Sequence, residues 1–286
     1  MSKSEANVIT VAVAQMDPHL GDYERNLGRI CALTQEALSH GARLVVFPEC
    51  ATSGYGFGDL PSAYAVAEPV PGPTTEALAD LCRAHSTAEG GPYVVVGVLE
   101  RTDDPDVVYN SAVLVGPEGW IGCYRKAHLP LLGVDRFTTP GDTGFLVWDT
   151  SIGRLGIIIC YDLRFPEAMR ALALSGADIV ALPTNWPDGS QNAPQFVTRT
   201  RALENRVFVA ACNRCGEESG FWFFGHSQIT DPGGNVLTEA EADEAICYAE
   251  IEPAQARRKR IVLRPGEFEL DTVGDRRPDL YDNISK

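Results

Sequence analysis

The stretch LGIIICYDLRFPE, residues 155–167, places three consecutive isoleucines directly before Cys160. An apolar β-branched run of this kind is typical of a strand that is buried on both faces. Proline is tolerated in the first turn of a helix, so a helix is expected from Pro166 to Leu174. Cys160 should therefore end a buried strand beside a helix N-terminus, whose partial positive charge would favour the thiolate. The alternative is that Cys160 is simply a small core residue.

The chain on both sides of this stretch alternates strands and helices. VITVAVAQ, a helix from about Tyr23 to His40 and the segment ARLVVFPE form a strand–helix–strand unit, which predicts two parallel strands. Asp22 is the expected N-cap of that helix, and Gly41 follows its last turn.

The remaining segments predict an α/β protein with many strands and few helices. Further helices are expected over about Thr74–His85 and Gln195–Asn205. The expected strands are PYVVVGVLE, VYNSAVLVG and GWIGCYRK as an antiparallel meander, FLVWDTSIGRLGIIIC as a hairpin, and ADIVALP, RVFVAACN, SQITD and NVLTEAEADEAICYAEI. This pattern suits two sheets packed face to face under outer helices. No repeat, low-complexity tract or long linker is visible, which predicts a single domain over residues 1–286.

The charge of the chain excludes some classes of partner. The 286 residues carry 39 acids and 24 bases, a net charge of −15, which argues against nucleic acid or an anionic membrane as partner. The one basic run, 257–260, is expected on a solvated face or at a subunit contact. No apolar run approaches the roughly 20 residues of a membrane helix, and the N-terminus does not resemble a signal peptide. We expect a cytoplasmic protein.

Eight cysteines without a secretory signal indicate reduced thiols rather than disulfides. Cys212 and Cys215 form a lone C-x-x-C after a strand-like segment. Zinc would require a second pair of ligands, and a thioredoxin-like motif should open a helix, so we expect neither a metal nor a redox role.

Three polar residues follow three buried-looking strands. Glu49 ends LVVFPE, Lys126 ends GWIGCYRK and Cys160 ends LGIIIC. Chemistry in open α/β sheets collects beyond the carboxyl ends of the strands. A thiol could attack a carbonyl or nitrile carbon, a carboxylate could move the proton, and an ammonium could stabilise the oxyanion together with the backbone N–H of Tyr161. Taken alone, each residue has an ordinary structural explanation, so the prediction depends on the three together.

The motifs around these residues resemble the nitrilase, or carbon–nitrogen hydrolase, superfamily. FPECATSGY surrounds Glu49, YRKAHL surrounds Lys126, and CYDLRFPE begins at Cys160. PGDTG, RALENRVFVAACN and GHSQITDPGGNVL extend the likeness over about residues 8–252. The resemblance implies a four-layer αββα sandwich, a Glu-Lys-Cys triad and no metal or organic cofactor. It also implies a core of about residues 8–252 and a homodimer or higher homo-oligomer, in which the C-terminal tail of about residues 253–286 can cross onto the neighbouring subunit, as it often does in the family.

One position departs from the family pattern. Many relatives carry a second glutamate between the lysine and cysteine motifs, where this chain has Asp135, one methylene shorter. Asp135 is expected either to orient Lys126 or the substrate amine, or to be a loop acid paired with Arg136 or a neighbouring lysine.

The residues after the cysteine resemble the amidase and omega-amidase branches more than the nitrilases proper, which favour Trp-Glu there. We therefore expect hydrolysis of a small amide to carboxylate and ammonia, with N-carbamoyl amine hydrolysis or nitrile hydrolysis as alternatives. Arg164 either holds a substrate carboxylate or pairs with an acid such as Glu167. The candidate pocket residues are Tyr55, Tyr161, Asn185, Trp186 and the aromatic residues of 221–224.

Other classes of function leave different signatures. A Cys-His hydrolase would use His128 or His226 as its base. No G-x-S-x-G, P-loop or H-E-x-x-H motif occurs, which excludes the serine hydrolases, P-loop proteins and zinc proteases that carry these motifs. A non-catalytic binding protein on the same fold remains as the remote alternative.

Overall fold

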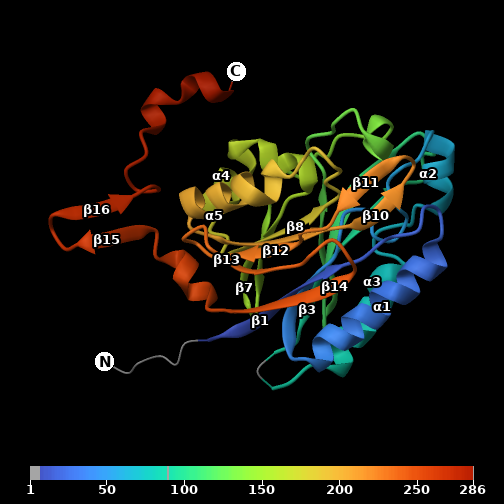
Figure 1. Cartoon of the computed structure of the whole chain (residues 1–286), viewed down its shortest axis with the longest axis horizontal. Coiled ribbons are helices and arrows are strands. Elements are labelled where there is room, and N and C mark those ends of the chain that lie inside the picture. Colours follow the sequence, from blue (N-terminus) through green and yellow to red (C-terminus); the bar gives the residue numbers. More distant parts are fainter. Residues whose placement is uncertain (1–6, 89, 286) are drawn as a thin grey trace.

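Two six-stranded sheets form the centre of the computed structural model, which describes residues 7–88 and 90–285 (Figure 1). In spatial order the first sheet contains β14 (Ala245–Ile251), β1 (Ile9–Gln15), β2 (Ala42–Val46), β3 (Tyr93–Arg101), β4 (Val108–Gly116) and β5 (Gly119–Arg125). The second contains β13 (Val236–Glu239), β12 (Gln228–Thr230), β9 (Phe208–Asn213), β8 (Ile179–Thr184), β7 (Gly153–Ile157) and β6 (Val147–Thr150).

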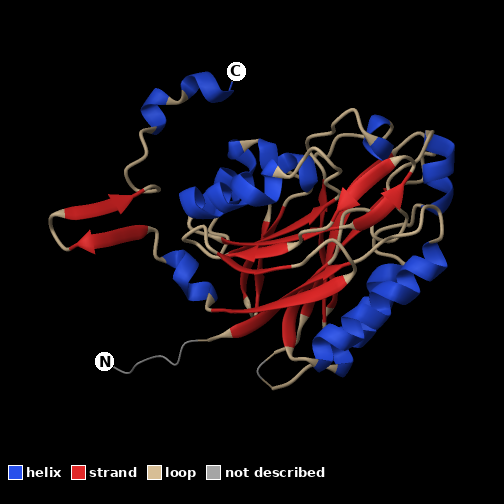
Figure 2. Cartoon of the chain, viewed as in Figure 1, coloured by secondary structure: helices blue, strands red, loops and turns tan. Residues whose placement is uncertain are grey.

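The alternation along β1 shows how these layers pack. Val11 and Val13 lie in the core between the sheets, whereas Ala12 and Ala14 pack on the other face with residues of the helices α1 and α3. Figure 2 shows helices outside both sheets: α1 (Tyr23–Ser39) and α3 (Pro73–Ala84) cover the first, and α4 (Pro166–Leu174) and α5 (Arg199–Asn205) cover the second. The expected four-layer αββα sandwich is confirmed.

Local sequence signals predicted most of these elements correctly. Asp22 caps α1, because its side chain accepts a hydrogen bond from the backbone N–H of Arg25, and Gly41 follows the helix with a φ of +84°. Strands β1 and β2 are parallel, and β3, β4 and β5 form the expected antiparallel meander. The hairpin of β6 and β7 and the helix α4 also lie where the sequence predicts them.

Other elements differ from the prediction. The segment expected as one strand near the C-terminus is two strands, β13 and β14, which belong to different sheets. The chain crosses between the sheets at the acidic residues in between, where the Gln15 side chain donates to the carbonyls of Glu241 and Asp243. The helix expected over 195–205 begins as a π-turn, Ala193–Thr198, and becomes α-helical only at Arg199. The sequence prediction did not include the helix α2 (Leu60–Val66) or the hairpin of β10 (Cys215–Glu218) and β11 (Phe221–Phe224).

The C-terminal tail leaves the sandwich and forms a second unpredicted hairpin. After a short 3-10 helix, Pro253–Arg257, the strands β15 (Arg260–Arg264) and β16 (Phe268–Asp271) project from the body (Figure 1). Two more 3-10 turns, Pro278–Leu280 and Asp282–Ser285, follow. Within the described ranges, no helix combines the length and the apolarity needed to cross a membrane.

Candidate active site

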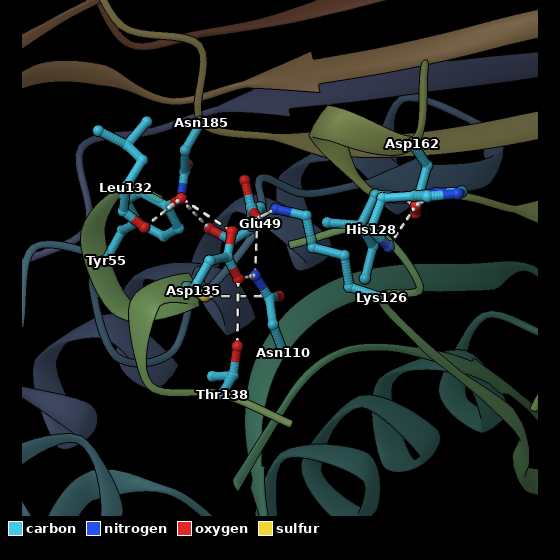
Figure 3. Close-up of polar contacts among 12 residues, drawn as sticks. Glu49, Tyr55, Asn110, Lys126, His128, Leu132, Asp135, Thr138, Asp162 and Asn185 are labelled. Atoms are coloured by element: carbon cyan, nitrogen blue, oxygen red, sulfur yellow. Dashed lines mark hydrogen bonds and ion pairs between the residues drawn. The ribbon is translucent and has the colours of Figure 1, made fainter. Parts of the chain in front are cut away.

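Glu49 and Lys126 meet in a fully buried ion pair between the sheets. Glu49 lies just beyond β2, and Lys126 directly follows β5. The Nζ of Lys126 donates to Oε1 of Glu49 at 2.6 Å, and neither side chain is exposed to solvent (Figure 3). Both residues therefore lie at the same end of the first sheet.

Asp135 completes this charge cluster from the other side of the lysine. It lies in a 3-10 turn, Gly133–Arg136, and its Oδ2 accepts from Lys126 Nζ at 2.5 Å. The Tyr55 hydroxyl also donates to Oδ2, at 2.8 Å (Figure 3). Arg136 instead donates to the carbonyls of Gly133 and Phe57. The partner of Asp135 is thus Lys126, which the carboxylate holds in place.

Cys160 occupies a strained backbone position. Strand β7 ends at Ile157 rather than at the cysteine, and Cys160 opens a 3-10 turn, Cys160–Arg164, with a φ of +45°. A non-glycine residue keeps this conformation only when its surroundings impose it. Asp162 supplies part of that constraint, because its Oδ2 accepts from the backbone N–H of Ile159 at 3.0 Å and from the Tyr124 hydroxyl at 2.8 Å.

The electrostatics of Cys160 correct the expectation of a pre-formed thiolate. The pKa of the Cys160 thiol is raised to about 12, chiefly by burial and next by the charge of Glu49, whereas Lys126 lowers it. The Thr184 hydroxyl and the Asn185 backbone N–H also lower this pKa, but do not reverse the effect of burial. At neutral pH the group is a thiol, so it needs a base before it can act as a nucleophile.

Glu49 has one carboxylate oxygen that is free to accept a proton. Its Oε1 accepts from Lys126 and, at 2.7 Å, from the Asn110 side chain. Its Oε2 is buried and has no hydrogen-bond partner among the described residues. Burial raises the pKa of the Glu49 carboxyl, Lys126 lowers it and Asp135 raises it. The free oxygen of a carboxyl with a raised pKa suits the transfer of a thiol proton.

Lys126 keeps its positive charge in this dry site. Burial alone would lower the pKa of its ammonium group, but the carboxylates of Asp135 and Glu49 outweigh burial and hold that pKa well above the usual value. Cys160 and Lys126 act on each other electrostatically, so the ammonium is a positive charge near the Cys160 sulfur.

The predicted pocket residues fall into two groups. Tyr55 and Trp186 are 2% and 4% exposed. The Tyr55 hydroxyl is a hydrogen-bond donor to the Asp135 carboxylate and to the Leu132 carbonyl. Asn185 is also buried, and its Nδ2 donates to the Glu49 carbonyl at 2.9 Å, whereas its Oδ1 has no partner in the described chain. Tyr161 is 37% exposed and is the candidate at the surface. In β11, Phe223 and Phe224 are buried, and Phe221 and Trp222 are exposed.

The histidines proposed for a Cys-His pair have other partners. Nδ1 of His128 lies 2.7 Å from Asp162, and Nδ1 of His226 lies 2.8 Å from Glu239. Neither is among the groups with the largest effects on the pKa of Cys160. Arg164 is exposed and donates to Asn192 at 3.0 Å; within residues 7–88 and 90–285 it forms no ion pair, so the expected salt bridge to Glu167 is wrong.

The remaining sequence candidates lie away from this cluster. Cys212 and Cys215 are buried free thiols in β9 and β10. In the basic run, Arg257 pairs with Asp178 at 2.8 Å, and Lys259 donates to the carbonyls of Asn205 and Arg206. Part of this run therefore fastens the tail to its own subunit instead of serving only a solvated face or a subunit contact.

Asn110 and Asp162 are the site residues that the sequence analysis missed. Asn110 is the one inward-facing polar residue of VYNSAVLVG between Val108 and Ala112, and a polar residue at a core position of a strand is the signal that could have identified it. Asp162 stands within the motif CYDLRFPE, and its contacts with Tyr124 and Ile159 depend on the fold rather than on a local signal.

Comparison with known proteins identifies relatives over nearly the whole chain. A family model described as carbon–nitrogen hydrolase matches residues 10–261. A protein of Pyrococcus abyssi named nitrilase is 41% identical over 276 residues, which cover 96% of this chain and 99% of the relative. An omega-amidase of Mus musculus is 31% identical over 268 residues, which cover 88% of this chain and 93% of the relative.

Solved structures show the same architecture. A carbon–nitrogen hydrolase of Helicobacter pylori superposes with a TM-score of 0.85 at 27% identity, over 98% of this chain and 99% of that one. An amidase of Nesterenkonia, solved in complex with acrylamide, superposes with a TM-score of 0.81 over 99% of both chains, and at 23% identity it supports the fold alone.

Proposed function

This chain belongs to the carbon–nitrogen hydrolase family, and we propose that it hydrolyses a small linear amide to a carboxylate and ammonia through a thioester on Cys160. The observation that carries the proposal is the free, buried Oε2 of Glu49, on a carboxyl group that acts electrostatically on a protonated thiol. No metal or organic cofactor is required by this chemistry.

The first half of the reaction acylates the enzyme. The Cys160 sulfur attacks the amide carbon while its proton passes to Oε2 of Glu49, and the carbonyl electron pair moves onto oxygen. The Lys126 ammonium and the backbone N–H of Tyr161 stabilise that oxyanion, a contribution typically worth about 3–4 kcal/mol for one donor. The intermediate collapses, the C–N bond breaks, and Glu49 returns the proton to the departing nitrogen as ammonia leaves.

The second half releases the acid. Glu49 removes a proton from water as the water oxygen attacks the thioester carbon. Collapse breaks the C–S bond, and Glu49 returns the proton to the cysteine sulfur. One water is consumed, and the thiol and the carboxylate are both regenerated.

The buried acceptors favour an amide over a nitrile. Oε2 of Glu49 and Oδ1 of Asn185 have no partner among the described residues, and a primary amide brings two N–H donors, whereas a nitrile brings none. A nitrile substrate remains the second candidate because a relative with 41% identity is named nitrilase. N-carbamoyl amines would use the same three residues.

The test is release of ammonia from primary amides, N-carbamoyl amines and nitriles, with Cys160→Ala as the inactive control and Cys215→Ala as the matched active control. We expect amide turnover that only the Cys160 variant loses. Turnover of nitriles alone would overturn the choice of substrate. Undiminished ammonia release by Cys160→Ala would overturn the mechanism. Tight binding of an amide by the wild-type protein without turnover would indicate a non-catalytic binding protein on the same fold.

We further propose that the enzyme is at least a homodimer whose tail contacts the neighbouring subunit. The exposed apolar residues of the β15–β16 hairpin support this, because a two-stranded hairpin alone is marginally stable in water. They are Val262, Leu263, Phe268 and Leu270. The experiment is gel filtration of the full chain and of a chain cut after Ile251. A monomer in both cases would refute the assembly.

A further inference from the structure

Asn110 touches both carboxylates that flank Lys126. It lies in β4, is 1% exposed, and its Nδ2 donates to Oε1 of Glu49 at 2.7 Å and to Oδ1 of Asp135 at 2.8 Å. Figure 3 shows the amide below the two acids, on the opposite side from Asn185.

The orientation of this amide is determined by its neighbours. An amide nitrogen carries two hydrogens, and two carboxylate oxygens lie on the nitrogen side. On the other side the Cys50 thiol faces Oδ1, with the sulfur 3.7 Å away. A flipped amide would place its oxygen against two carboxylates, so only one orientation is stable.

We propose that Asn110 is a positioning residue that holds the Glu49 and Asp135 carboxylates on either side of the Lys126 ammonium and leaves Oε2 of Glu49 free for Cys160. This role rests on the proposed function, in which Glu49 is the base. Asn110 acts through Glu49 and need not touch the substrate.

The physical need for a neutral donor follows from the charge of the cluster. Two fully buried carboxylates share one ammonium, so they repel each other. A second cation would neutralise the base, and an apolar side chain would leave Oε1 of Glu49 and Oδ1 of Asp135 each short of a donor. The amide gives one N–H to each acid and adds no charge.

The test replaces Asn110 by leucine, which keeps the volume and removes both donors, and by serine, which keeps one donor. Ser111→Ala is the matched control, because Ser111 is the next residue of β4, is fully buried, and donates to Glu100 at 2.7 Å away from the site. The titratable groups that act on Glu49 are all retained in these variants: Lys126, Asp135, Cys160, Cys50 and Tyr55.

Two readouts separate this proposal from the proposed function. The first is the acidic limb of the pH profile of kcat/KM for an amide, which reports the free enzyme's base. The second is the pH profile of Cys160 alkylation by iodoacetamide, followed by mass spectrometry, which needs no turnover. If the wild-type enzyme releases no ammonia from any amide, the proposed function fails and the alkylation profile still tests Asn110.

A carboxylate that loses a hydrogen bond becomes a stronger proton acceptor, so the pKa of Glu49 should rise. The acidic limbs of the kcat/KM profile and of the alkylation profile should therefore both move to higher pH. We expect a shift of about one pH unit for Asn110→Leu and a smaller shift for Asn110→Ser, with plateau turnover about tenfold lower for leucine. Ser111→Ala should leave both limbs in place. If Asn110→Leu does not fold, Asn110→Ser decides the question. The proposal is overturned if the folded serine variant has the same acidic limbs as the wild type in both pH profiles.

Discussion

The Nζ of Lys126 lies 2.5 Å from Oδ2 of Asp135, and both side chains are completely buried. Asp135 reaches the lysine from the 3-10 turn Gly133–Arg136. It raises the pKa of Lys126, and it also raises the pKa of Glu49. One aspartate therefore secures the ammonium and makes the base stronger.

Asp135→Asn should lower turnover about tenfold or more, because Lys126 loses an ionic partner that fixes its position. Removal of the negative charge also lowers the pKa of Glu49, so the acidic limb of kcat/KM should move to lower pH, opposite to the shift expected for Asn110→Leu. Measurement of kcat/KM for an amide over about pH 4–9 tests both effects. Asp142→Asn, at an exposed acid, is the control, and a fully active Asp135→Asn with an unchanged limb would refute the role.

Glu49→Gln should separate the two functions of the carboxylate. It removes the base, so ammonia release should fall about 100-fold or more. The thiol pKa of Cys160 should fall below its value of about 12, because the charge of Glu49 helps to raise it. Alkylation of Cys160 by iodoacetamide should then follow the thiol's own titration at alkaline pH. A variant that keeps wild-type ammonia release would show that another group takes the proton.

The parts of the site that were predictable from the sequence are those encoded locally. The isoleucines before Cys160 and the run before Glu49 identify buried strands, and each reactive residue stands within a few positions of its strand. The short hairpin β10–β11 lacked such a signal, because only two of the four residues in β11 are buried.

Partnerships between distant residues could not be predicted in this way. Asn110 and Glu49 are 61 positions apart, and Tyr55 and Glu218 are 163 apart. Alternation along β4 gives the face on which Asn110 lies, but the packing of β2, β4 and the 133–136 turn decides which acids it meets. The raised pKa of Cys160 could not be predicted from the local sequence either, because its largest cause is burial, which depends on the whole fold.

Arg164→Ala tests whether this arginine binds a substrate carboxylate. Arg164 is exposed, lies four residues after Cys160, and uses one nitrogen to contact Asn192, so no acid neutralises it in the described chain. The variant should raise KM about tenfold for an amide that carries a carboxylate and leave KM for a neutral aliphatic amide unchanged. Arg83→Ala on α3 is the control. Equal effects on both substrates would assign Arg164 a structural role.

Glu218 links the unpredicted hairpin to the site and provides the last test. Its Oε1 accepts from the backbone N–H groups of Tyr55 and Gly56 at 2.8 and 2.7 Å, and its Oε2 lies 2.8 Å from the fully buried Arg214. Glu218→Ala leaves the Arg214 guanidinium with Asp17 as its ion-pair partner. It also removes the acceptor that holds the backbone of the loop carrying Tyr55.

In Glu218→Ala the Tyr55 and Gly56 N–H groups lose their acceptor, and Arg214 keeps Asp17 as its acid partner. The substitution should therefore lower the free energy of unfolding by about 3 kcal/mol. Turnover should also fall, since the Tyr55 hydroxyl supports Asp135. Denaturant unfolding and amide kinetics measure the two effects, and Glu217→Ala, at the exposed neighbouring position, should change neither. A Glu218 variant that is destabilised but fully active would show that the hairpin supports the fold without positioning Asp135.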